Sequence, residues 1–510
     1  MDVLTRRQLI QYSAIMSGVL AGPSFVKPTP PAPRDTSLSG QSVKPEADSH
    51  LASTPIDSSV FSDIFSTGAM RRVFSDQNRL QKYLDVEAAL ARVQGRLGII
   101  PRAAADEIQR HASADKFDVG KLKARTELVG YPVQPVVEQL VSLCTGKFGE
   151  YCHWGATTQD ITDTATVLQI REALQLVDQD LTAICETLAG LAKRYRDTPM
   201  AGRTHLQHAV PITFGLKMAV LLAAFERHRE RLVEMRRRVL VGQFAGAAGT
   251  LSSLGTRGLE VQSGLMMELN LGQPEIVWHT TRDRFAEVGC FLGLVTGTLG
   301  KLATDIKLLM QTEVSEVFEP FEYGRGSSST MPQKRNPISC EYIQACTSAV
   351  RQNVASLLDA MIEDHERASG AWQIEWIALP EAFLLSAGAL NQARQLLSGL
   401  QVDPKRMRSN LDMTGGLIVS EAVMMGLAPY LGHEHAHELV YRVCREVSET
   451  GRPMIDLLIE EPEISRSLDK AALTKLVDPT NYLGLSGVMV DRVLSSRGGG
   501  LSPAARTSTA

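Results

Sequence analysis

The sequence predicts an all-α protein built on a bundle of long helices. Apolar residues recur in alternating steps of three and four from Phe285 to Leu309, which is the spacing of an unbroken a/d seam on a long, coiled-coil-like helix. Alternating Val, Ile and aromatic runs typical of strands are almost absent, and aromatic residues make up only 5% of the 510 residues. We therefore expect smaller helical regions before and after a central long-helix bundle.

The composition is that of an ordinary globular protein. Hydrophobic residues contribute 44% and charged residues 22%, which excludes wholesale disorder and a collagen-like chain. The 53 basic and 57 acidic residues give a net charge of −4, so no basic surface for nucleic acid is expected. The seven cysteines are scattered and odd in number, which favours free thiols over a disulfide framework.

The first fifty residues differ from the rest. Arg6 and Arg7 precede a weakly apolar stretch, residues 10–21, that is too short to span a bilayer. This pattern resembles a twin-arginine export signal over residues 1–22, followed by a Pro- and Ser-rich linker over 23–55. It predicts a periplasmic protein; the alternative is a cytoplasmic protein whose tail happens to carry two adjacent arginines.

Beyond the linker we expect an N-terminal helical domain over 56–160, the long-helix bundle over 161–400, a C-terminal helical domain over 401–496 and a disordered tail over 497–510. Helical periodicity also marks residues 79–97, 162–196, 212–240, 341–363, 380–400 and 434–450.

Glycines line one face of the segment that carries the a/d seam. Gly289, Gly293 and Gly297 recur every four residues and Gly300 follows, which predicts close approach of a neighbouring helix. A membrane span is excluded for this segment, because Glu287 and Lys301 bracket an apolar run that is too short. No stable membrane insertion is expected.

The stretch from Gly324 to Glu341 carries the most chemistry. Two glycines, three serines and two prolines within its first fourteen residues predict a loop between long helices. Lys334 and Arg335 can bind an anion, but the spacing of a phosphate-binding loop is missing.

This stretch resembles the G-S-S-x-M-P-x-K-x-N-P signature of the fumarase/aspartase superfamily. Ser328, Met331, Lys334 and Asn336 occupy matching positions, and Ser327 stands where the family usually has glycine. The resemblance extends from about Met70 to the C-terminal helices.

Two further blocks match the family in the right order. Residues 202–209 resemble its G-R-T-H-x-Q block, with His205 and Gln207. Residues 153–160 resemble its H-x-G-x-T-S-x-D block, with His153 and Thr157, followed by Thr158 and Gln159.

The resemblance implies a cofactor-free and metal-free enzyme that removes a proton from the carbon beside a carboxylate and expels a leaving group. Ser328 would be the base and His205 the general acid, held by Glu341, which lies thirteen residues after the serine. His153 would be the second catalytic histidine. The substrate-binding residues implied are Thr157, Thr158, Gln159, Gln207, Lys334, Asn336 and Arg367.

Cations and donors are needed in such a site because negative charge develops on the carboxylate side of the substrate. The family also implies a homotetramer whose sites combine the three blocks from different subunits.

One tempting metal motif is set aside. Residues 433–437 fit H-E-x-x-H, which would place His433 and His437 one turn apart for zinc. The motif follows Gly432 and no third ligand suggests itself nearby, so a helix start is the better interpretation.

Within the superfamily, nucleotide substrates are disfavoured. Adenylosuccinate lyases hold a phosphate with an Arg and then a Ser and an Arg; here Arg367 persists, but Trp372 and Trp376 fall on the later positions. Both indoles could equally be core packing at i,i+4. The pattern around these tryptophans and residues 70–76, 411–417 and 478–484 look like the 3-carboxy-cis,cis-muconate cycloisomerase branch, which serves aromatic catabolism.

The leading hypothesis is therefore a lyase or cycloisomerase acting on a small polycarboxylate. A C–N or C–O lyase that releases fumarate, as adenylosuccinate lyase does, stays open as an alternative. So does a non-enzymatic structural relative of the same fold.

Overall fold

The computed structural model describes residues 54–320 and 322–497, which belong to one compact unit. The export signal expected over 1–22 lies outside the described residues, as do almost all of the linker and the C-terminal tail. The predictions for the two ends of the chain therefore stay predictions.

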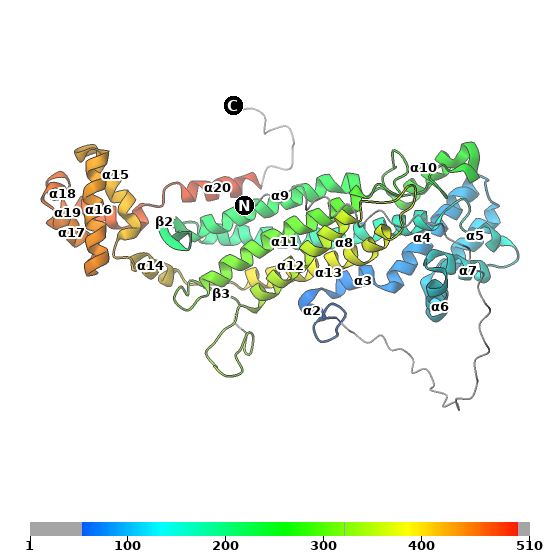
Figure 1. Ribbon diagram of the computed structural model, residues 1–510, viewed down its shortest axis with the longest axis horizontal. Helices are drawn as coiled ribbons and strands as arrows, with labels where there is room; N and C mark the ends of the chain where they lie inside the picture. Colours follow the sequence, from blue (N-terminus) through cyan, green and yellow to red (C-terminus); the bar gives the residue numbers. More distant parts are fainter. Residues whose placement is uncertain (1–53, 321, 498–510) are drawn as a thin grey trace, which may run out of the picture. The chain divides into compact units, whose positions relative to one another are not determined.

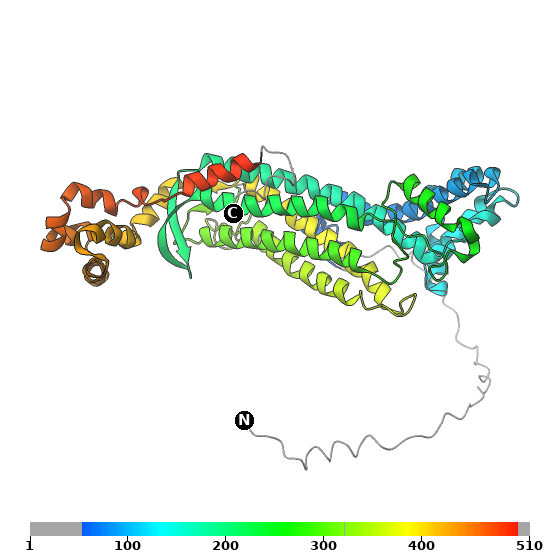
Figure 2. The ribbon, with the colours of Figure 1, turned by 90° about the horizontal axis from the view of Figure 1, so that it is seen from above.

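Five long helices form the central bundle (Figures 1 and 2). They are α8 (Thr158–Arg194), α9 (Phe214–Val239), α11 (Asp283–Leu309), α12 (Ile338–Asp359) and α13 (Ala371–Ser398). α8 packs against α9 and α13, and α11 packs against α9, α12 and α13. The predicted all-α bundle is confirmed.

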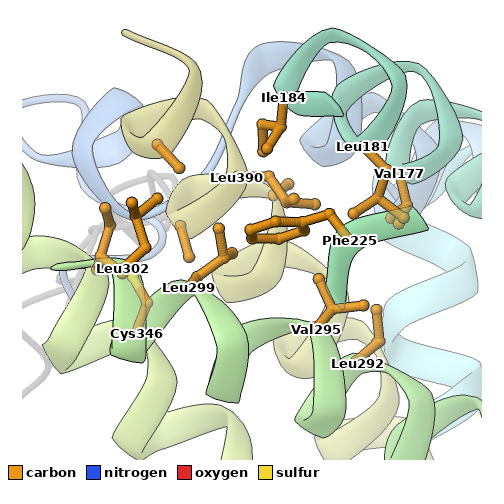
Figure 3. Close-up of a cluster of buried hydrophobic side chains, with 14 of the residues drawn as sticks. Val177, Leu181, Ile184, Phe225, Leu292, Val295, Leu299, Leu302, Cys346 and Leu390 are labelled. Carbon is orange, nitrogen blue, oxygen red and sulfur yellow. The ribbon is translucent and has the colours of Figure 1, made fainter. Parts of the chain in front are cut away.

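The a/d seam of α11 is the centre of this bundle. The eight seam residues are buried: Phe285, Val288, Leu292, Val295, Leu299, Leu302, Ile306 and Leu309. Figure 3 shows four of them with Val177, Leu181 and Ile184 of α8, Phe225 of α9, Cys346 of α12 and Leu390 of α13. Burial of this apolar stripe is what orders the long helices.

The glycine face of α11 meets α12, with one exception. A Cβ at Gly289 would lie 2.6 Å from Leu357 Cδ1, and one at Gly293 would lie 3.1 Å from Val354 Cγ2. A Cβ at Gly300 would lie 3.3 Å from Thr347 Cγ2. Gly297 has no such neighbour within 4 Å, so the expected close contact is absent there.

The N-terminal region is a cluster of shorter helices with its own apolar core. The first turns of α8 pack into this core, and so does α10, although α10 follows α9 in the chain. Its elements are α4 (Asp76–Arg96), α5 (Arg102–His111), η1 (Ala114–Lys116), α6 (Val119–Val129), α7 (Val133–Leu143), η2 (Phe148–Tyr151), η3 (Ser252–Arg257) and α10 (Gly258–Leu269). The two helices that precede them, α2 (Ser62–Phe65) and α3 (Gly68–Phe74), pack on the bundle instead, against α13 and α8.

The C-terminal region is likewise helical, and its last helix returns to pack on α9. β3 (Val317–Phe318) and β4 (Gln401–Val402) pair at its start. The helices are α14 (Pro404–Asp412), η4 (Leu417–Val419), α15 (Ser420–Leu431), α16 (His433–Thr450), α17 (Met454–Glu460), α18 (Pro462–Ser467), α19 (Lys470–Val477), η5 (Pro479–Asn481) and α20 (Ser486–Ser496).

A β-hairpin interrupts the helices between α8 and α9. β1 (Pro199–Thr204) pairs antiparallel with β2 (Gln207–Thr213), and the turn between them consists of His205 and Leu206. Both turn residues have positive φ, 50° and 65°, as a two-residue hairpin turn requires. This hairpin is not predicted from the sequence, because its turn lacks the Asn and Gly residues that usually mark one.

By length and composition, α11 and the bent pair of α14 with η4–α15 are apolar enough to cross a membrane, within the described residues. In α11, 56% of the most apolar window is buried inside the protein. The seam contacts above account for that apolar character.

Candidate active site

His153 is paired with a buried carboxylate. Its Nδ1 lies 2.6 Å from Glu87 Oε1, and its backbone N–H donates to Glu87 Oε2 at 3.1 Å. Glu87 belongs to α4 and is 2% exposed. Burial alone would lower the pKa of His153, but the Glu87 carboxylate outweighs it and raises the pKa above its usual value. His153 is thus suited to carry a proton and a positive charge near neutral pH.

Asp160 fixes the start of α8. Its carboxylate accepts the backbone N–H groups of Thr157 at 3.0 Å, and of Ala245 and Gly246 at 2.9 Å each. His279 Nε2 lies 2.8 Å from the same carboxylate. These contacts tie the loop before α10 to the N-terminus of α8, where Thr157 and Thr158 stand at the positive end of the helix dipole.

Gln159, in the first turn of α8, is buried and forms a hydrogen bond with Arg367. The side chain of Gln159 is buried; its Nε2 donates to His279 O, and its Oε1 accepts from Arg367, both at 2.8 Å. Arg367 also donates to Ala247 O at 2.8 Å. The structure therefore brings Arg367 to the block that begins at His153. It gives Gln159 a supporting place; direct contact of Gln159 with a substrate stays a prediction.

A buried charge cluster supports these residues from below. The guanidinium of Arg282, 1% exposed, donates to Asp163 at 2.7 Å and to Glu375 at 2.9 Å. A third acid, Glu363, lies 3.7 Å from Arg282, and neither of its oxygens has a hydrogen-bond partner. Burial raises the pKa of Glu363 to about 7. One arginine thus faces three carboxyl groups. Glu363, the one without a hydrogen bond, is partly protonated near pH 7.

His205 stands exposed at the tip of the β1–β2 hairpin, with Gln207 exposed beside it. Arg203, which lies close to the turn, donates to the buried Glu316 at 2.6 and 3.0 Å and anchors the hairpin near its tip. A positive φ at a non-glycine residue stores strain, and such strain is common at functional sites. The hairpin presents the His205 imidazole away from the chain's own core.

The Ser328 hydroxyl is held by the loop that carries it. Its Oγ accepts the backbone N–H groups of Met331 at 3.1 Å and Thr330 at 3.3 Å. The stem of the loop is closed by the Asn336 N–H, which donates to Gly326 O at 2.9 Å. Lys334 is exposed in the same loop. Two backbone donors and a nearby cation are what an oxygen needs to carry negative charge.

Glu341 lies in the first turn of α12 and is exposed. Within residues 54–320 and 322–497 of one chain, no ion pair or hydrogen bond joins Glu341 to His205. Their predicted pairing is therefore not made inside a single copy and stays a prediction for an assembly.

The predicted site residues fall into two groups at opposite ends of the bundle (Figures 1 and 2). His153, Thr157, Thr158, Gln159 and Arg367 gather at the N-terminal end of α8. His205 follows its C-terminal end, and Arg203 links that end to Glu316, which leads into the Ser328 loop. α8 has 37 residues and α11 has 27. At about 1.5 Å per residue these helices separate the two groups by about 40 Å or more.

The remaining motifs have structural places. α16 begins at His433, as predicted, and His435 Nε2 lies 2.7 Å from Glu463. No group of three or more metal-ligating side chains is found in the part of the chain that the structure describes. Trp372 is buried, packs edge-on against Trp376 at 5.0 Å between ring centroids, and stacks on Tyr131 at 6.0 Å. Trp372 is thus buried against aromatic neighbours, as the core-packing interpretation expects, whereas Trp376 is only half-buried.

Comparison with known proteins places this geometry in a family. Residues 65–351 match the family described as Lyase, and residues 416–493 match the one described as Adenylosuccinate lyase C-terminus. The chain belongs to the fumarase/aspartase superfamily of lyases. The superfamily and the enzyme class expected from the sequence are confirmed.

Two curated relatives cover nearly the same part of the chain. Trans-aconitate decarboxylase 1 of Mycosarcoma maydis is 57% identical over 434 residues, which are 85% of this chain and 88% of the relative. The 3-carboxy-cis,cis-muconate cycloisomerase of Pseudomonas aeruginosa is 47% identical over 439 residues, 86% of this chain and 96% of the relative.

A solved structure of a superfamily member confirms the fold. The 3-carboxy-cis,cis-muconate lactonizing enzyme from Pseudomonas putida is 42% identical to this chain, with a TM-score of 0.83. The match covers 86% of this chain and 99% of that one.

Sequence reasoning missed Glu87. The signal was present, because Leu80, Leu84, Glu87 and Ala91 follow a seam spacing within one helix, and a carboxylate on such a buried stripe needs a partner. The partner, His153, lies 66 residues further along the chain, so only the fold reveals the pair.

Proposed function

We propose that this lyase acts on a small polycarboxylate by proton transfer at the carbon beside a carboxylate, without a cofactor. The observation that carries the proposal is Ser328, whose oxygen accepts two backbone N–H groups in a loop that also bears Lys334. That arrangement stabilises an alkoxide, which can take the proton that a hydroxyl cannot.

We further propose an unsaturated tricarboxylate, or the lactone derived from one, as the substrate. Both curated relatives above carry the names of such compounds, trans-aconitate and 3-carboxy-cis,cis-muconate. Three cationic groups of the candidate site suit three carboxylates: Lys334, Arg367 and protonated His153. Among these substrates the cycloisomerase reaction predicted from the sequence stays the leading proposal.

The proton inventory of that reaction is simple. In the direction of lactone opening, the Ser328 oxygen takes the proton beside the carboxylate and the electron pair forms a C=C bond. The C–O bond of the lactone breaks and leaves a free carboxylate. Lys334, Asn336 and the hydroxyls of Thr157 and Thr158 balance the negative charge that builds up during proton removal. His205 returns or donates protons where the leaving group requires one.

A complete site needs more than one copy of the chain. Ser328 and His153 lie about 40 Å or more apart along the helices of one chain, whereas reacting groups must lie within about 3.5 Å of their target. We propose a homotetramer in which each site takes its blocks from different subunits, as the superfamily resemblance implies. Analytical ultracentrifugation measures the assembly directly.

We also propose export by the twin-arginine route, from Arg6 and Arg7 and the weakly apolar stretch over residues 10–21 that follows them. Fractionation of cells that express the full chain, followed by N-terminal sequencing of the protein, tests it. A cytosolic protein that keeps Met1 contradicts the proposal.

The decisive experiment is a substrate panel followed by ultraviolet absorbance and carbon dioxide release. The panel holds 3-carboxy-cis,cis-muconate and its lactone, trans-aconitate and adenylosuccinate. We expect turnover of a tricarboxylate or its lactone, loss of at least about a thousandfold in kcat for Ser328→Ala, and near-full activity for the control Ser448→Ala, at an exposed serine of α16. Fumarate release from adenylosuccinate would favour the C–N lyase alternative. Full activity of Ser328→Ala would overturn the assignment of the base.

A further inference from the structure

Glu363 is a buried carboxyl group in the loop between α12 and α13, over residues 360–370. Its side chain is 0% exposed, and its Oε1 lies 3.7 Å from Arg282 Nε. Neither of its oxygens has a hydrogen-bond partner within the part of the chain that the structure describes. A carboxyl group that is buried without a donor is costly to ionise.

Arg282 has no N–H group left for Glu363. Its Nε donates to Glu375, and its two terminal nitrogens donate to Asp163, to Glu375 and to the carbonyl oxygen of His279. These five contacts use all five N–H groups of a guanidinium. Asp163 and Glu375 together already bring two negative charges to one positive charge. An ionised Glu363 would add a third negative charge with no donor to stabilise it.

The same loop carries Arg367, four residues after Glu363. The Asp364 carboxylate accepts the Ser369 N–H at 2.9 Å and the Ser369 hydroxyl at 2.6 Å. The Asp364 carbonyl oxygen accepts the Arg367 N–H at 3.1 Å, so these residues form one hydrogen-bonded turn. From this turn the Arg367 guanidinium donates to Gln159. The position of that guanidinium therefore depends on how the turn packs against the bundle.

We propose that Glu363 is a positioning residue: while its carboxyl group is neutral it keeps Arg367 in place for the substrate, and when the group ionises Arg367 is released. The inference rests on the proposed function, in which Arg367 binds a carboxylate of the substrate. A neutral Glu363 packs beside Arg282 without adding charge. An ionised Glu363 is repelled by Asp163 and Glu375, and the turn moves towards solvent, where water stabilises the charge.

The charged groups that face Glu363 come from each element packed against it: Arg282 at the start of α11, Glu375 of α13, Asp163 of α8 and Arg367 of its own loop. Burial is the main cause that raises the pKa of Glu363 to about 7 from 4.5. The neutral acid therefore favours the packed loop below pH 4.5, and this contribution is lost as the pH rises towards 7. Between pH 5.5 and 7.5 the ratio of packed to released loop should fall by up to about twentyfold.

Hydrogen exchange followed by mass spectrometry tests the loop movement and needs no substrate. The full-length protein is compared at about pH 5.5 and pH 7.5, with each rate corrected for the pH dependence of intrinsic exchange. In the wild type, protection of peptides that cover residues 361–370 should fall at least about fivefold at the higher pH, whereas it should stay constant in Glu363→Gln. The control Glu366→Gln removes an exposed carboxylate of the same loop and should behave like the wild type. Constant protection in the wild type, or an equal fall in Glu363→Gln, overturns the proposal.

Steady-state kinetics on the best substrate of the panel test the link to Arg367. At about pH 7.5, Glu363→Gln should have a KM at least about fivefold below that of the wild type, with kcat within about twofold. At about pH 5.5 the two KM values should agree, and Glu366→Gln should follow the wild type at both pH values. In an Arg367→Ala background, Glu363→Gln should leave KM unchanged, because the group that it positions is gone.

The kinetic outcomes separate positioning from other roles. A change in kcat without a change in KM, or a KM difference that persists in the Arg367→Ala background, contradicts the positioning of Arg367. If no panel compound is turned over, the proposed function fails, and the exchange measurement still decides whether Glu363 controls the loop.

Discussion

The two ends of α8 present the predicted site residues in opposite ways. At the N-terminal end, Asp160 and Gln159 are fully buried and connect the backbone of Thr157 to Arg367 through hydrogen bonds within one chain. At the C-terminal end, His205 is exposed on a hairpin tip and bonds to nothing in its own chain within the described residues. The predicted site residues at the N-terminal end are held by contacts within one chain, whereas those at the C-terminal end are exposed to solvent or to another molecule. The three sequence blocks that match the family therefore do not come together in one site within a single chain.

Subunit mixing gives the largest expected effect. Ser328→Ala should lose at least about a thousandfold in kcat because it removes the proposed base, and His153→Ala at least about a hundredfold because it removes a proposed proton carrier. The two groups lie at opposite ends of the bundle. When the two variants are refolded together, about a quarter of the sites should regain both groups, if each site draws its blocks from different copies. Recovered activity after refolding is the measurement.

A matched mixture serves as the control. Ser328→Ala and Lys334→Ala change the same loop, so every site that receives this loop from either variant stays damaged. No recovery is expected from that pair. Equal recovery, or equal failure, of the two mixtures would contradict the division into two half-sites.

Loss of the buried partner of His153 should cost less. Glu87→Gln removes the negative charge that raises the pKa of His153, so the pKa should fall. If protonated His153 acts in the reaction, kcat/KM should drop by about ten- to a hundredfold at neutral pH. The basic limb of the pH–rate profile should move to lower pH.

The pH profile separates this role from simple folding damage. Glu107→Gln removes another buried carboxylate of the same region, one that holds Thr145 and not His153. It should leave the position of the basic limb unchanged. A basic limb that stays in place for Glu87→Gln would exclude His153 as its origin.

Glu363 should make the protein less stable as the pH rises. Its folded-state pKa is about 7, against an ordinary value of 4.5, so the folded state holds a proton that the unfolded state has already released between these pH values. This contribution to stability is fully present below pH 4.5 and is lost as the pH approaches 7. Glu363→Gln should therefore raise the free energy of unfolding at pH 8 by about 2 to 3 kcal/mol and change it little at pH 4.5.

Denaturant unfolding at the two pH values measures this difference. The exposed neighbour Glu366 provides the control, since Glu366→Gln should behave like the wild type at both. A variant of Glu363 that gains nothing at pH 8 would mean that its carboxyl group is solvated or paired in solution.

The smallest effect compares two glycines of α11. Gly289→Ala would place a methyl group 2.6 Å from Leu357 Cδ1 and should destabilise the protein by about 1 to 3 kcal/mol. Gly297→Ala meets nothing within 4 Å and should be neutral or stabilising by up to about 1 kcal/mol, because Ala favours the helix. Thermal unfolding of both variants checks the sign. A destabilising Gly297→Ala would indicate that another copy packs against that face.

The helices could be predicted because one face of each is buried, so apolar residues recur at helical spacing in the sequence. Most predicted ends lie within a few residues of the observed ones, but α13 begins at Ala371, nine residues before the predicted start at Pro380. Pro380 lies inside α13, and the helix continues through it. The β1–β2 hairpin escaped prediction because His205 and Leu206 adopt the left-handed conformation that Asn and Gly normally supply.

The site residues could be chosen by motif but not arranged by it. Gln159 lies inside a motif that predicts substrate binding, yet its buried side chain accepts a hydrogen bond from Arg367. Glu87 was missed because its partner is distant in sequence. The distance between Ser328 and His153 is also invisible in the motifs, because it depends on the direction in which α8 and α11 run.

The length of α8, 37 residues without a break, sets the distance between the two groups of predicted site residues. Each residue added to or removed from a helix turns everything beyond it by about 100° and shifts it by about 1.5 Å. An insertion or deletion in α8 would thus shift one group of predicted site residues relative to the other, even though it changes none of them. Changes of activity on this fold should therefore come from substitutions and from changes in the loops, while the length of α8 stays constant.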